Sequence, residues 1–566
     1  MIDPYRMVVV NIIVFLFLLF GVLFYKFIYP RRNINPLFLL IMISLLPLIS
    51  ILIKGGYESG DLSIHSMFAM SFYDALKDGN IIPRWAGEIN YGFGYPLFLF
   101  LYPLPYYLIS VFHSLGLSFI ASIKLVLISS FLISGIAMYL WIKEELKNNL
   151  AAFTGALFYL FAPYHLVDMH FRVAIGETVA FALLPLCFLT IKKLSVNLSF
   201  KWFTLSAISY SLFILSHQVI SLFSFPFIIG YSFFLWLRKK PKKIKQISYP
   251  ILSIITGLLL SSFYWLPLIF ESKYTSILTK SEIWFPKLYQ FFYSPWRWGL
   301  LFQGHKGELS FIVGYAQWFA IILSILLFFK YINRRGIKEK QLYLVTIASF
   351  FIIFIMMQSL SNLVWASIPL LKGSQFSYRL LILSSFFSSI IAGIVIKNIN
   401  KKIFFIGLCL ITVSTTILNW GNRKTILAID DRYIRNELPY VMGTGLNFGP
   451  GSTIWLDNKK FKIDKLAKNH VEIISGQASI IELGRTSSSH KYLIRVSTNT
   501  VFRENTLYFP GWILKINNKI HLFEQNNSKY PGIIVFRLPK GVYKMELIFT
   551  NTPIRTLSIA ISVLSL

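Results

Sequence analysis

The chain has very little cysteine and little charge. Only two of its 566 residues are cysteines, Cys187 and Cys409, and both lie inside apolar runs, which excludes a disulfide framework and a cysteine-based zinc site. Charged residues make up only 14% of the chain, whereas a soluble globular protein is nearer to about one quarter. Hydrophobic residues supply 55% of the chain, and many runs reach the roughly 20 residues that cross a bilayer core. We therefore expect a polytopic α-helical membrane protein.

Acidic residues are also scarce, with 24 against 55 basic residues and a net charge of +31. This excess does not indicate nucleic acid as a partner, because the basic residues form short clusters between apolar runs, as the positive-inside rule describes. Clusters such as Arg31-Arg32, Lys192-Lys193 and Arg238 to Lys245 are therefore predicted to be cytoplasmic. Glycine-rich phosphate loops, a Walker lysine and a His-Glu-x-x-His pattern are absent, so nucleotide-driven chemistry in the cytosol is unsupported.

The apolar runs predict about 13 membrane spans. They cover approximately 7–28, 36–53, 118–142, 150–166, 178–192, 202–216, 219–237, 248–270, 310–331, 342–358, 380–396, 403–420 and 553–566. The first run lacks a basic start and a small-residue cleavage site, so it is expected to be a retained span. The basic clusters alternate consistently only if the run 97–116 does not cross the membrane. Because it also contains Pro103 and Pro105, we expect it to be a helix that lies on or dips into the outer face.

Residues 421–552 differ in pattern from the apolar runs. Tyr492, Ile494 and Val496 alternate with polar neighbours, as do Tyr543 and Met545, and turn residues separate the runs. Period-two alternation broken by turns predicts an antiparallel β-sandwich. We expect a transmembrane domain over 1–420, an extracytoplasmic sandwich over 421–552 that holds or selects a glycan acceptor, and a terminal transmembrane segment over 553–566.

The first predicted external loop, 54–117, holds acids close to a membrane span. Glu58 and Asp61 precede a helical pattern over Leu62–Leu76, and His65 lies one turn into it. Carboxylates near a membrane are costly unless they are solvated, paired or used. Asp61 is typical of a helix N-cap, and equally of a general base at a helix terminus that faces a cavity; the residues favour neither. His65 and Arg84 are candidates for binding the acceptor or orienting the base.

Four further candidates are predicted on the same face. Arg172 can hold an anion through its forked guanidinium, or pair with Glu177 or a lipid phosphate, and the entry of Glu177 into a span favours a cavity. His217 lies at a sharp corner between two apolar runs, where a polar turn is the commoner role and a ligand or acid–base role the alternative. Arg379 begins a span, where it can reach the headgroups or bind a phosphate entering from the bilayer.

This arrangement resembles the GT-C superfamily of membrane glycosyltransferases. Glu58-Ser-Gly-Asp61 occupies the place of its first acidic motif, and Arg172 to Glu177, after Phe161-Ala-Pro-Tyr164, looks like the second external motif of oligosaccharyltransferases. The resemblance implies a catalytic acid in the early external loop and a sugar donor on a membrane polyprenyl phosphate. The second motif lacks its paired acid here, so a divalent metal is an open but unsupported alternative, and no cofactor is certain.

Six stretches resemble the YfhO-like, "6-pyruvoyl-tetrahydropterin synthase-related" membrane proteins, and their order is preserved. They are Ile82-Pro-Arg-Trp85, Asn90-Tyr-Gly-Phe-Gly-Tyr-Pro96, Tyr102-Pro-Leu-Pro-Tyr-Tyr107, Arg172-Val-Ala-Ile-Gly-Glu177, Gln375-Phe-Ser-Tyr-Arg379 and Tyr508-Phe-Pro-Gly-Trp512. This resemblance implies a fold better than a reaction, because a fold does not fix a function.

Together these patterns lead to one hypothesis and two alternatives. The hypothesis is an inverting glycosyltransferase at the outer face of the cytoplasmic membrane, which moves a sugar from a polyprenyl-phosphate donor to a glycan, lipid or protein acceptor. Asp61 is the general base, with Glu58 beside it; Arg172 and Arg379 bind the donor phosphate, and Glu177, His217, His65 and Arg84 bind the acceptor or orient the base. The alternatives are a flippase or transporter of lipid-linked saccharides and a non-catalytic factor in assembling envelope polysaccharides.

Overall fold

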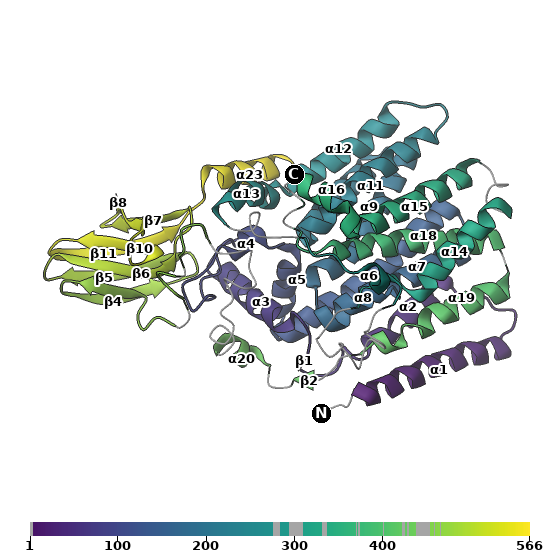
Figure 1. Cartoon of the computed structure of the whole chain (residues 1–566), viewed down its shortest axis with the longest axis horizontal. Helices are drawn as coiled ribbons and strands as arrows, with labels where there is room; N and C mark the ends of the chain where they lie inside the picture. The colour runs from purple at the N-terminus through teal and green to yellow at the C-terminus, as the bar shows by residue number, and fades with distance from the viewer. Residues whose placement is uncertain are drawn as a thin grey trace. The chain divides into compact units, whose positions relative to one another are not determined.

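The chain forms two compact units in a computed structural model (Figure 1). The structure describes residues 4–275, 283–293, 310–330, 337–368, 371, 374–399, 401–421, 425–426, 429–436, 453–457, 459–463 and 466–566. The first unit combines residues 1–62, 120–260 and 282–428, and the second combines 63–119, 261–281 and 429–566. The predicted division at residues 420 and 552 stays a prediction, but segments 63–119 and 261–281 group with the C-terminal sheets rather than with the helices beside them in sequence.

The first unit is almost entirely helical. Its longer helices are α1 (Pro4–Ile28), α2 (Pro36–Ser44), α6 (Phe119–Leu146), α7 (Asn149–Leu160), α9 (Ile175–Val196), α10 (Phe200–Ser216), α11 (Gln218–Leu237), α12 (Lys245–Leu260), α14 (Tyr315–Lys330), α15 (Ile337–Met356), α18 (Leu381–Ile399) and α19 (Lys402–Ser414). Its short turns include α8 (Pro163–Val167), the π-helical turn η2 (Asp168–Arg172), α16 (Asn362–Ser367) and the 3₁₀ turns η1 (Leu46–Leu48), η4 (Leu288–Phe291), η6 (Ser359–Ser361), η7 (Ser377–Leu380) and η8 (Ile417–Asn419). A two-residue ribbon pairs β1 (Gly56–Tyr57) with β2 (Thr425–Ile426).

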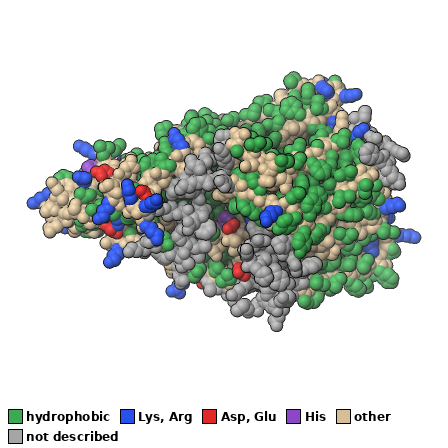
Figure 2. All heavy atoms as spheres, viewed as in Figure 1, with side chains coloured by type: hydrophobic (Ala, Val, Ile, Leu, Met, Phe, Trp, Pro, Cys, Tyr) green, Lys and Arg blue, Asp and Glu red, His purple; other side chains and the backbone are tan. Residues whose placement is uncertain are grey.

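Several of these helices have the length and composition of membrane spans, which confirms the polytopic helical class. Five described helices are long and apolar enough to cross a bilayer, or up to eight if each bent pair counts as one span. Every predicted span between residues 7 and 420 coincides with a helix or a bent pair, although α2, α10, α14 and α19 are shorter than a full crossing. Figure 2 shows hydrophobic side chains covering most of the visible helical surface, with lysine and arginine side chains at its right-hand edge.

Two of the basic clusters predicted to share a membrane side, Lys192-Lys193 and the one that begins at Arg238, converge at one end of the first unit. Glu145, at the end of α6, pairs with Lys192 of α9 and with Arg238, which follows α11. Its neighbour Glu144 pairs with Lys147 and Lys193. The C-terminal ends of α6, α9 and α11 are therefore gathered on one side, which leaves the opening turns of α9 and α11 at the opposite end.

The second unit joins short helices to two antiparallel sheets (Figure 1). The helices are α3 (Leu62–Lys77), α4 (Leu97–Phe100), α5 (Leu104–Ser114), α13 (Ser262–Glu271), the 3₁₀ turn η3 (Ser272–Tyr274), α20 (Asp431–Asn436) and α23 (Pro553–Leu564). The strands are β3 (Val471–Ser475), β4 (Ala478–Arg485), β5 (Ser489–Val496), β6 (Thr500–Leu507), β7 (Trp512–Ile516), β8 (Lys519–His521), β9 (Glu524–Asn526), β10 (Pro531–Leu538) and β11 (Gly541–Phe549). α23 has 12 residues and rises only about 18 Å, so the terminal transmembrane segment stays a prediction.

The period-two prediction for the C-terminal strands is confirmed. The strand orders are β3-β6-β10-β9 and β4-β5-β11-β7-β8. In β5, Tyr492, Ile494 and Val496 are buried, whereas Lys491 before them and Arg495 between the last two are exposed. The turn between β7 and β8 uses Asn517-Asn518 with φ of 49° and 65°, as two-residue hairpin turns of the primed types require.

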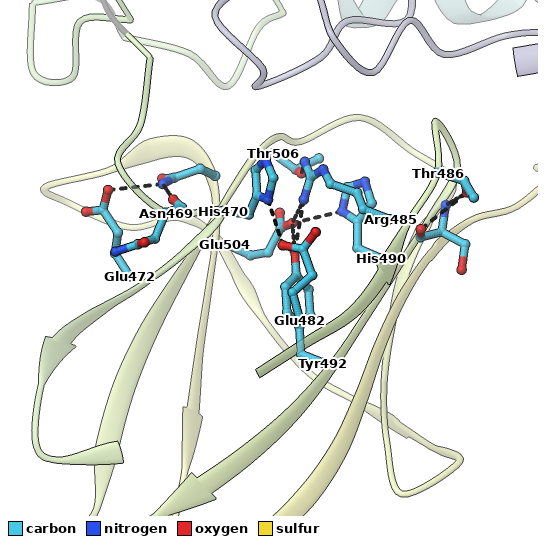
Figure 3. Close-up of polar contacts among 12 residues, drawn as sticks. Asn469, His470, Glu472, Glu482, Arg485, Thr486, His490, Tyr492, Glu504 and Thr506 are labelled. Carbon is cyan, nitrogen blue, oxygen red and sulfur yellow. Dashed lines mark hydrogen bonds and ion pairs between the residues drawn. The ribbon is translucent and has the colours of Figure 1, made fainter. Parts of the chain in front are cut away.

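A buried polar cluster connects the two sheets (Figure 3). Glu504 of β6 accepts hydrogen bonds from Arg485 of β4 at 2.9 Å and from Tyr492 of β5 at 3.3 Å, and its carboxylate lies 2.8 Å from His490 Nδ1. Burial alone raises the pKa of Glu504, but His490 and Arg485 outweigh it and lower the pKa to about 2. Burial also lowers the pKa of His490, with Arg485 and His470 acting in the same direction and Glu504 opposing them.

These shifts predict that the sheets lose stability in acid. The His490 pKa is lower in the folded than in the unfolded chain, so below about pH 6.5 the unfolded chain binds a proton that the folded chain resists. Glu504 acts in the same direction, since its stabilisation is present above its ordinary pKa of 4.5 and is lost as the pH falls toward 2. Hydrogen exchange of the β5 and β6 amides, corrected for the intrinsic pH dependence, should show protection falling below about pH 6.5. In a His490→Asn variant, protection should stay constant until the pH falls below 4.5, where Glu504 begins to lose its stabilising effect. A variant whose protection falls with pH as in the wild type would contradict the assignment of this loss to His490.

Candidate functional site

The two external loops that carry the sequence motifs are joined through their backbones in the first unit. The Gly60 amide donates to the Phe171 carbonyl at 2.8 Å, and the Asp61 amide donates to the Arg172 carbonyl at 2.9 Å. The Tyr57 hydroxyl adds a bond to the Met169 carbonyl at 2.9 Å. These contacts hold Asp61 directly beside Arg172, although the two residues are 111 positions apart in the sequence.

A lysine fixes the start of this loop. Lys124 of α6 donates to the carbonyls of Ile53 and Gly55 at 2.6 and 2.5 Å. The β1–β2 ribbon then pairs Gly56 and Tyr57 with Ile426 and Thr425. The chain therefore reaches Glu58 and Asp61 from an anchored backbone.

The Asp61 carboxylate does not cap the helix that follows it. The hydroxyl of Ser59 accepts the Leu62 amide at 3.3 Å at the start of α3. Among the described residues, the half-buried Asp61 carboxylate has no hydrogen-bond or ion-pair partner, and Glu58 is exposed. Asp61 thus keeps both carboxylate oxygens available to accept a proton from another molecule.

The Arg172 segment has an unusual backbone. Residues 168–172 form a π-helical turn, and Val173 after it adopts the left-handed conformation with φ of 57°. π-helical turns are frequent at functional sites, and a β-branched residue at positive φ is strained by about 1–3 kcal/mol. The surrounding packing maintains this strain, since both the turn and Val173 are buried.

Arg172 is buried and held by three side chains. It donates to the Tyr164 hydroxyl at 2.9 Å, to Asp168 Oδ1 at 2.5 Å and to Glu177 Oε1 at 3.1 Å. The ring of Tyr378 lies against the guanidinium, with its centroid 5.4 Å from Cζ. Arg172 therefore has a fixed orientation and a matched charge before any ligand arrives.

Glu177 is the centre of this group of charges. Its Oε1 lies 3.3 Å from Arg379 Nε and 3.9 Å from His217 Nε2, in addition to its bond with Arg172. Its Oε2 accepts the Tyr164 hydroxyl, and the residue is 1% exposed. His217 caps α11 by accepting the Ile220 amide on Nδ1, so a neutral ring carries its proton on Nε2, toward Glu177.

Arg379 is the less constrained of the two arginines. It lies in η7, four residues after Gln375, which has a left-handed φ of 62°. Its Nη1 donates to the Ser374 carbonyl at 3.2 Å, and among the described residues its Nη2 has no recorded partner. A partly buried guanidinium with free N–H groups is suited to an anionic ligand.

Sequence reasoning identified Arg172, Glu177, His217 and Arg379, which the fold brings together, but it left Asp168 and Tyr164 without roles. Asp168 precedes Arg172 by four residues, and this helical spacing was the signal that could have paired them. Its Oδ2 is buried without a hydrogen-bond partner among the described residues. The group thus contains two arginines, Arg172 and Arg379, and two acids, Asp168 and Glu177.

The remaining two candidates belong to the second unit. His65 Nδ1 lies 2.7 Å from the Tyr106 hydroxyl inside a buried aromatic cluster. Arg84 is 8% exposed and donates to the Phe263 carbonyl at 3.5 Å. Within the part of the chain that the structure describes, no group of three or more His, Cys, Asp or Glu residues is arranged to hold a metal ion.

Comparison with known proteins gives distant relatives and similar structures. An uncharacterized protein of Lactococcus lactis subsp. cremoris is 26% identical over 317 residues, which cover 54% of this chain and 50% of that protein. The mycobacterial arabinofuranosyltransferase AftD is 16% identical, covering 68% of this chain and 26% of that chain, with a TM-score of 0.39. The Archaeoglobus fulgidus oligosaccharyltransferase is 13% identical, covering 69% of this chain and 56% of that chain, with a TM-score of 0.41.

A protein-family model provides the classification. Residues 98–421 match the model described as "6-pyruvoyl-tetrahydropterin synthase related domain; membrane protein". This region includes Arg172, Glu177, His217 and Arg379, and it confirms the family resemblance of the sequence motifs. Because the match covers more than half of its residues, the chain belongs to the 6-pyruvoyl-tetrahydropterin synthase related family of membrane proteins.

Proposed function

We propose that this protein is an integral membrane glycosyltransferase that moves a sugar from a polyprenyl-phosphate donor to an extracytoplasmic acceptor with inversion. The observation that carries the proposal is the backbone pairing of Gly60 and Asp61 with Phe171 and Arg172. It brings the backbone of Asp61, whose carboxylate has no partner among the described residues, next to the backbone of Arg172, whose guanidinium is held by Asp168, Tyr164 and Glu177. A base and a cationic site for a leaving group are the two elements that this reaction needs.

Asp61 acts as the general base. Its carboxylate accepts the proton of an acceptor hydroxyl while that oxygen attacks the anomeric carbon of the donor sugar. The bond from the anomeric carbon to the phosphate oxygen breaks, and the polyprenyl phosphate leaves with the bonding electrons. The contact between Ser59 and Leu62 supports this role, because it leaves the Asp61 carboxylate free of helix capping.

The arginines stabilise the departing phosphate in different ways. Arg379 offers the direct contact, since its Nη2 is available and the residue opens the helical segment formed by η7 and α18. Arg172 acts less directly, because its N–H groups donate to Asp168, Tyr164 and Glu177. It positions Glu177, and its positive charge attracts the departing phosphate. Glu177 and His217 hold this arrangement from α9 and from the start of α11.

The outer face is the proposed location of the site. Three site residues lie at or just before the starts of helices: Arg172 before α9, His217 before α11, and Arg379 in the η7–α18 segment. At the other ends of α6, α9 and α11, the ion pairs of Glu144 and Glu145 gather basic residues. Basic clusters favour the cytoplasmic side. We therefore propose that the site faces the outside of the cytoplasmic membrane. As a separate part of the proposal, the C-terminal sheets hold or select the glycan acceptor.

Transfer can be tested with the purified full chain in proteoliposomes that contain a labelled polyprenyl-phosphate sugar. A panel of hexose and pentose donors, supplied with a membrane-glycan extract as acceptor, should release free polyprenyl phosphate and label the acceptor. Movement of intact donor between leaflets without release of the phosphate would identify a flippase instead. If no donor is either cleaved or moved between the leaflets, the non-catalytic role is favoured.

Arg379→Gln should lower kcat/KM for transfer by about 10–100-fold, because a charge-assisted hydrogen bond contributes about 1.5–3 kcal/mol. Arg379→Lys should recover part of this loss, since it keeps the charge but not the forked geometry. The exposed Arg31 gives the matched control, and Arg31→Gln should leave transfer unchanged. Steady-state kinetics in proteoliposomes measure all three; equal kinetics for the two glutamine variants would contradict the phosphate role.

A further inference from the structure

A cavity lies within the second unit, and none of its lining residues has a role in the proposed transfer step. It has a volume of about 330 Å³ and is bounded by the loop after α3, the β4–β5 turn and the segment after β11. Its polar lining includes Asn80, Arg84, Ser487 and Asn551, and its apolar lining includes Trp85 and Phe549. This volume falls within the range of about 300–1,000 Å³ that is typical of small-molecule sites.

The lining arginine is buried but poorly satisfied. Arg84 is 8% exposed, and its one recorded hydrogen bond among the described residues is a 3.5 Å contact with the Phe263 carbonyl. A guanidinium has five N–H donors, so most of its hydrogen-bonding capacity is unused. Burial, together with the nearby charge of Arg555, lowers the pKa of Arg84 to about 10, while Glu271 and Tyr107 oppose this shift.

Arg555 shows what a satisfied arginine looks like in the same unit. It is fully buried and donates to Glu271 at 2.9 Å, to the Thr550 carbonyl at 3.1 Å and to the Pro510 carbonyl at 2.8 Å. Glu271 thus directs both of its recorded ion-pair contacts to Arg555 and none to Arg84. The charge of Arg84 faces the cavity without a carboxylate of its own.

The walls of the cavity are fixed before a ligand binds. The Asn80 side chain donates to Ser487 Oγ at 3.2 Å and to Ser488 Oγ at 3.1 Å, and Asp78 accepts the Ser487 amide at 2.8 Å. The Trp85 and Phe549 rings lie 5.1 Å apart. A rigid pocket loses little conformational entropy on binding, which favours affinity for a small ligand.

We propose that this cavity binds a sugar unit that carries a carboxylate or a phosphate. Arg84 supplies the charge for the anionic group, the side chains of Asn80, Ser487 and Asn551 supply hydroxyl contacts, and the aromatic rings supply an apolar surface for the sugar. The claim that this sugar is the acceptor of the transfer reaction rests on the proposed function. The claim that the cavity binds it does not. A lipid headgroup presents the same anionic chemistry from another source, and the test distinguishes the two.

The test measures binding by the purified full chain in neutral detergent. Isothermal titration with glucuronic acid, glucose 1-phosphate and glucose should give affinity for the two anions at least about tenfold higher than for glucose. Arg84→Gln should remove this preference, whereas Arg495→Gln, at an exposed arginine of β5, should keep it. Equal binding of glucose and its anionic forms, or an unchanged preference in Arg84→Gln, would overturn the proposal.

Three further measurements keep the result interpretable. Asn551 is exposed at the rim, so Asn551→Ala should fold normally and weaken the binding of the anionic sugars. Arg84→Met should unfold at the same or a higher temperature than the wild type without ligand, because an unpaired buried charge is removed. Binding to vesicles of phosphatidylglycerol that requires Arg84, with no binding of soluble anionic sugars, would assign the cavity to lipid and reject the sugar. Sugar binding without any transfer activity would reject the proposed function and leave this inference intact.

Discussion

Asp61→Asn should lower the rate of sugar transfer by about 10²–10⁴-fold, the usual contribution of a positioned general base. The fold should not change, because asparagine has the same shape and the Asp61 carboxylate has no hydrogen-bond partner among the described residues. The backbone bond from residue 61 to the Arg172 carbonyl is independent of the side chain and should persist. Single-turnover transfer from labelled donor, measured beside thermal unfolding, separates the two effects.

Glu58 provides the comparison for Asp61. It lies three residues earlier in the same loop, but its side chain is exposed. Glu58→Gln should therefore give a smaller loss than Asp61→Asn. The reverse order of effects would assign the base to Glu58, and equal wild-type rates for both variants would remove the base from this loop altogether.

Glu177→Gln should destabilise the first unit by about 3–5 kcal/mol, the usual effect of removing one partner of a buried ion pair. Glu177 is 1% exposed and lies against both Arg172 and Arg379, so the substitution leaves one buried and one partly buried cation with Asp168 as the remaining acid in the group. Transfer should be lost as well, because the arginines are free to reorient. Unfolding in detergent followed by tryptophan fluorescence measures the first effect.

The opposite end of the same unit supplies the matched control. Glu144 also pairs with two cations, Lys147 and Lys193, but its side chain is 26% exposed. Exposed pairs contribute about 0–1 kcal/mol, so Glu144→Gln should cost far less stability than Glu177→Gln. Similar losses for the two variants would mean that the Glu177 group is solvated and is not the rigid site described above.

Local patterns predicted the pieces of the candidate site, but not how they meet. Arg172 and Glu177 are five residues apart, so their proximity follows from sequence. The approach of Asp61 to Arg172 depends on hydrogen bonds between segments 111 residues apart, and no spacing rule encodes such a contact. The choice of Ser59 over Asp61 as the capping side chain is also a matter of loop geometry, which is why the residues alone favoured neither role for Asp61.

The grouping of the chain shows the same limit. The alternation in β5 and the Asn517-Asn518 turn predicted the sheets directly, because each is a local signal. The association of residues 63–119 and 261–281 with those sheets depends on long-range packing. Arg84 illustrates the difference: its sequence context made it a candidate for binding the acceptor or orienting the base, but its burial beside a cavity depends on this packing.

Sugar transfer itself is tested most directly by following the donor phosphate in proteoliposomes of the wild type and Asp61→Asn. The wild-type chain should convert a labelled polyprenyl-phosphate sugar into free polyprenyl phosphate and a glycoside of inverted anomeric configuration, and Asp61→Asn should do so at least about 100-fold more slowly. Equal conversion by both proteins, or a product of retained configuration, would contradict base catalysis by Asp61. No conversion of any donor by the wild type would contradict the transferase.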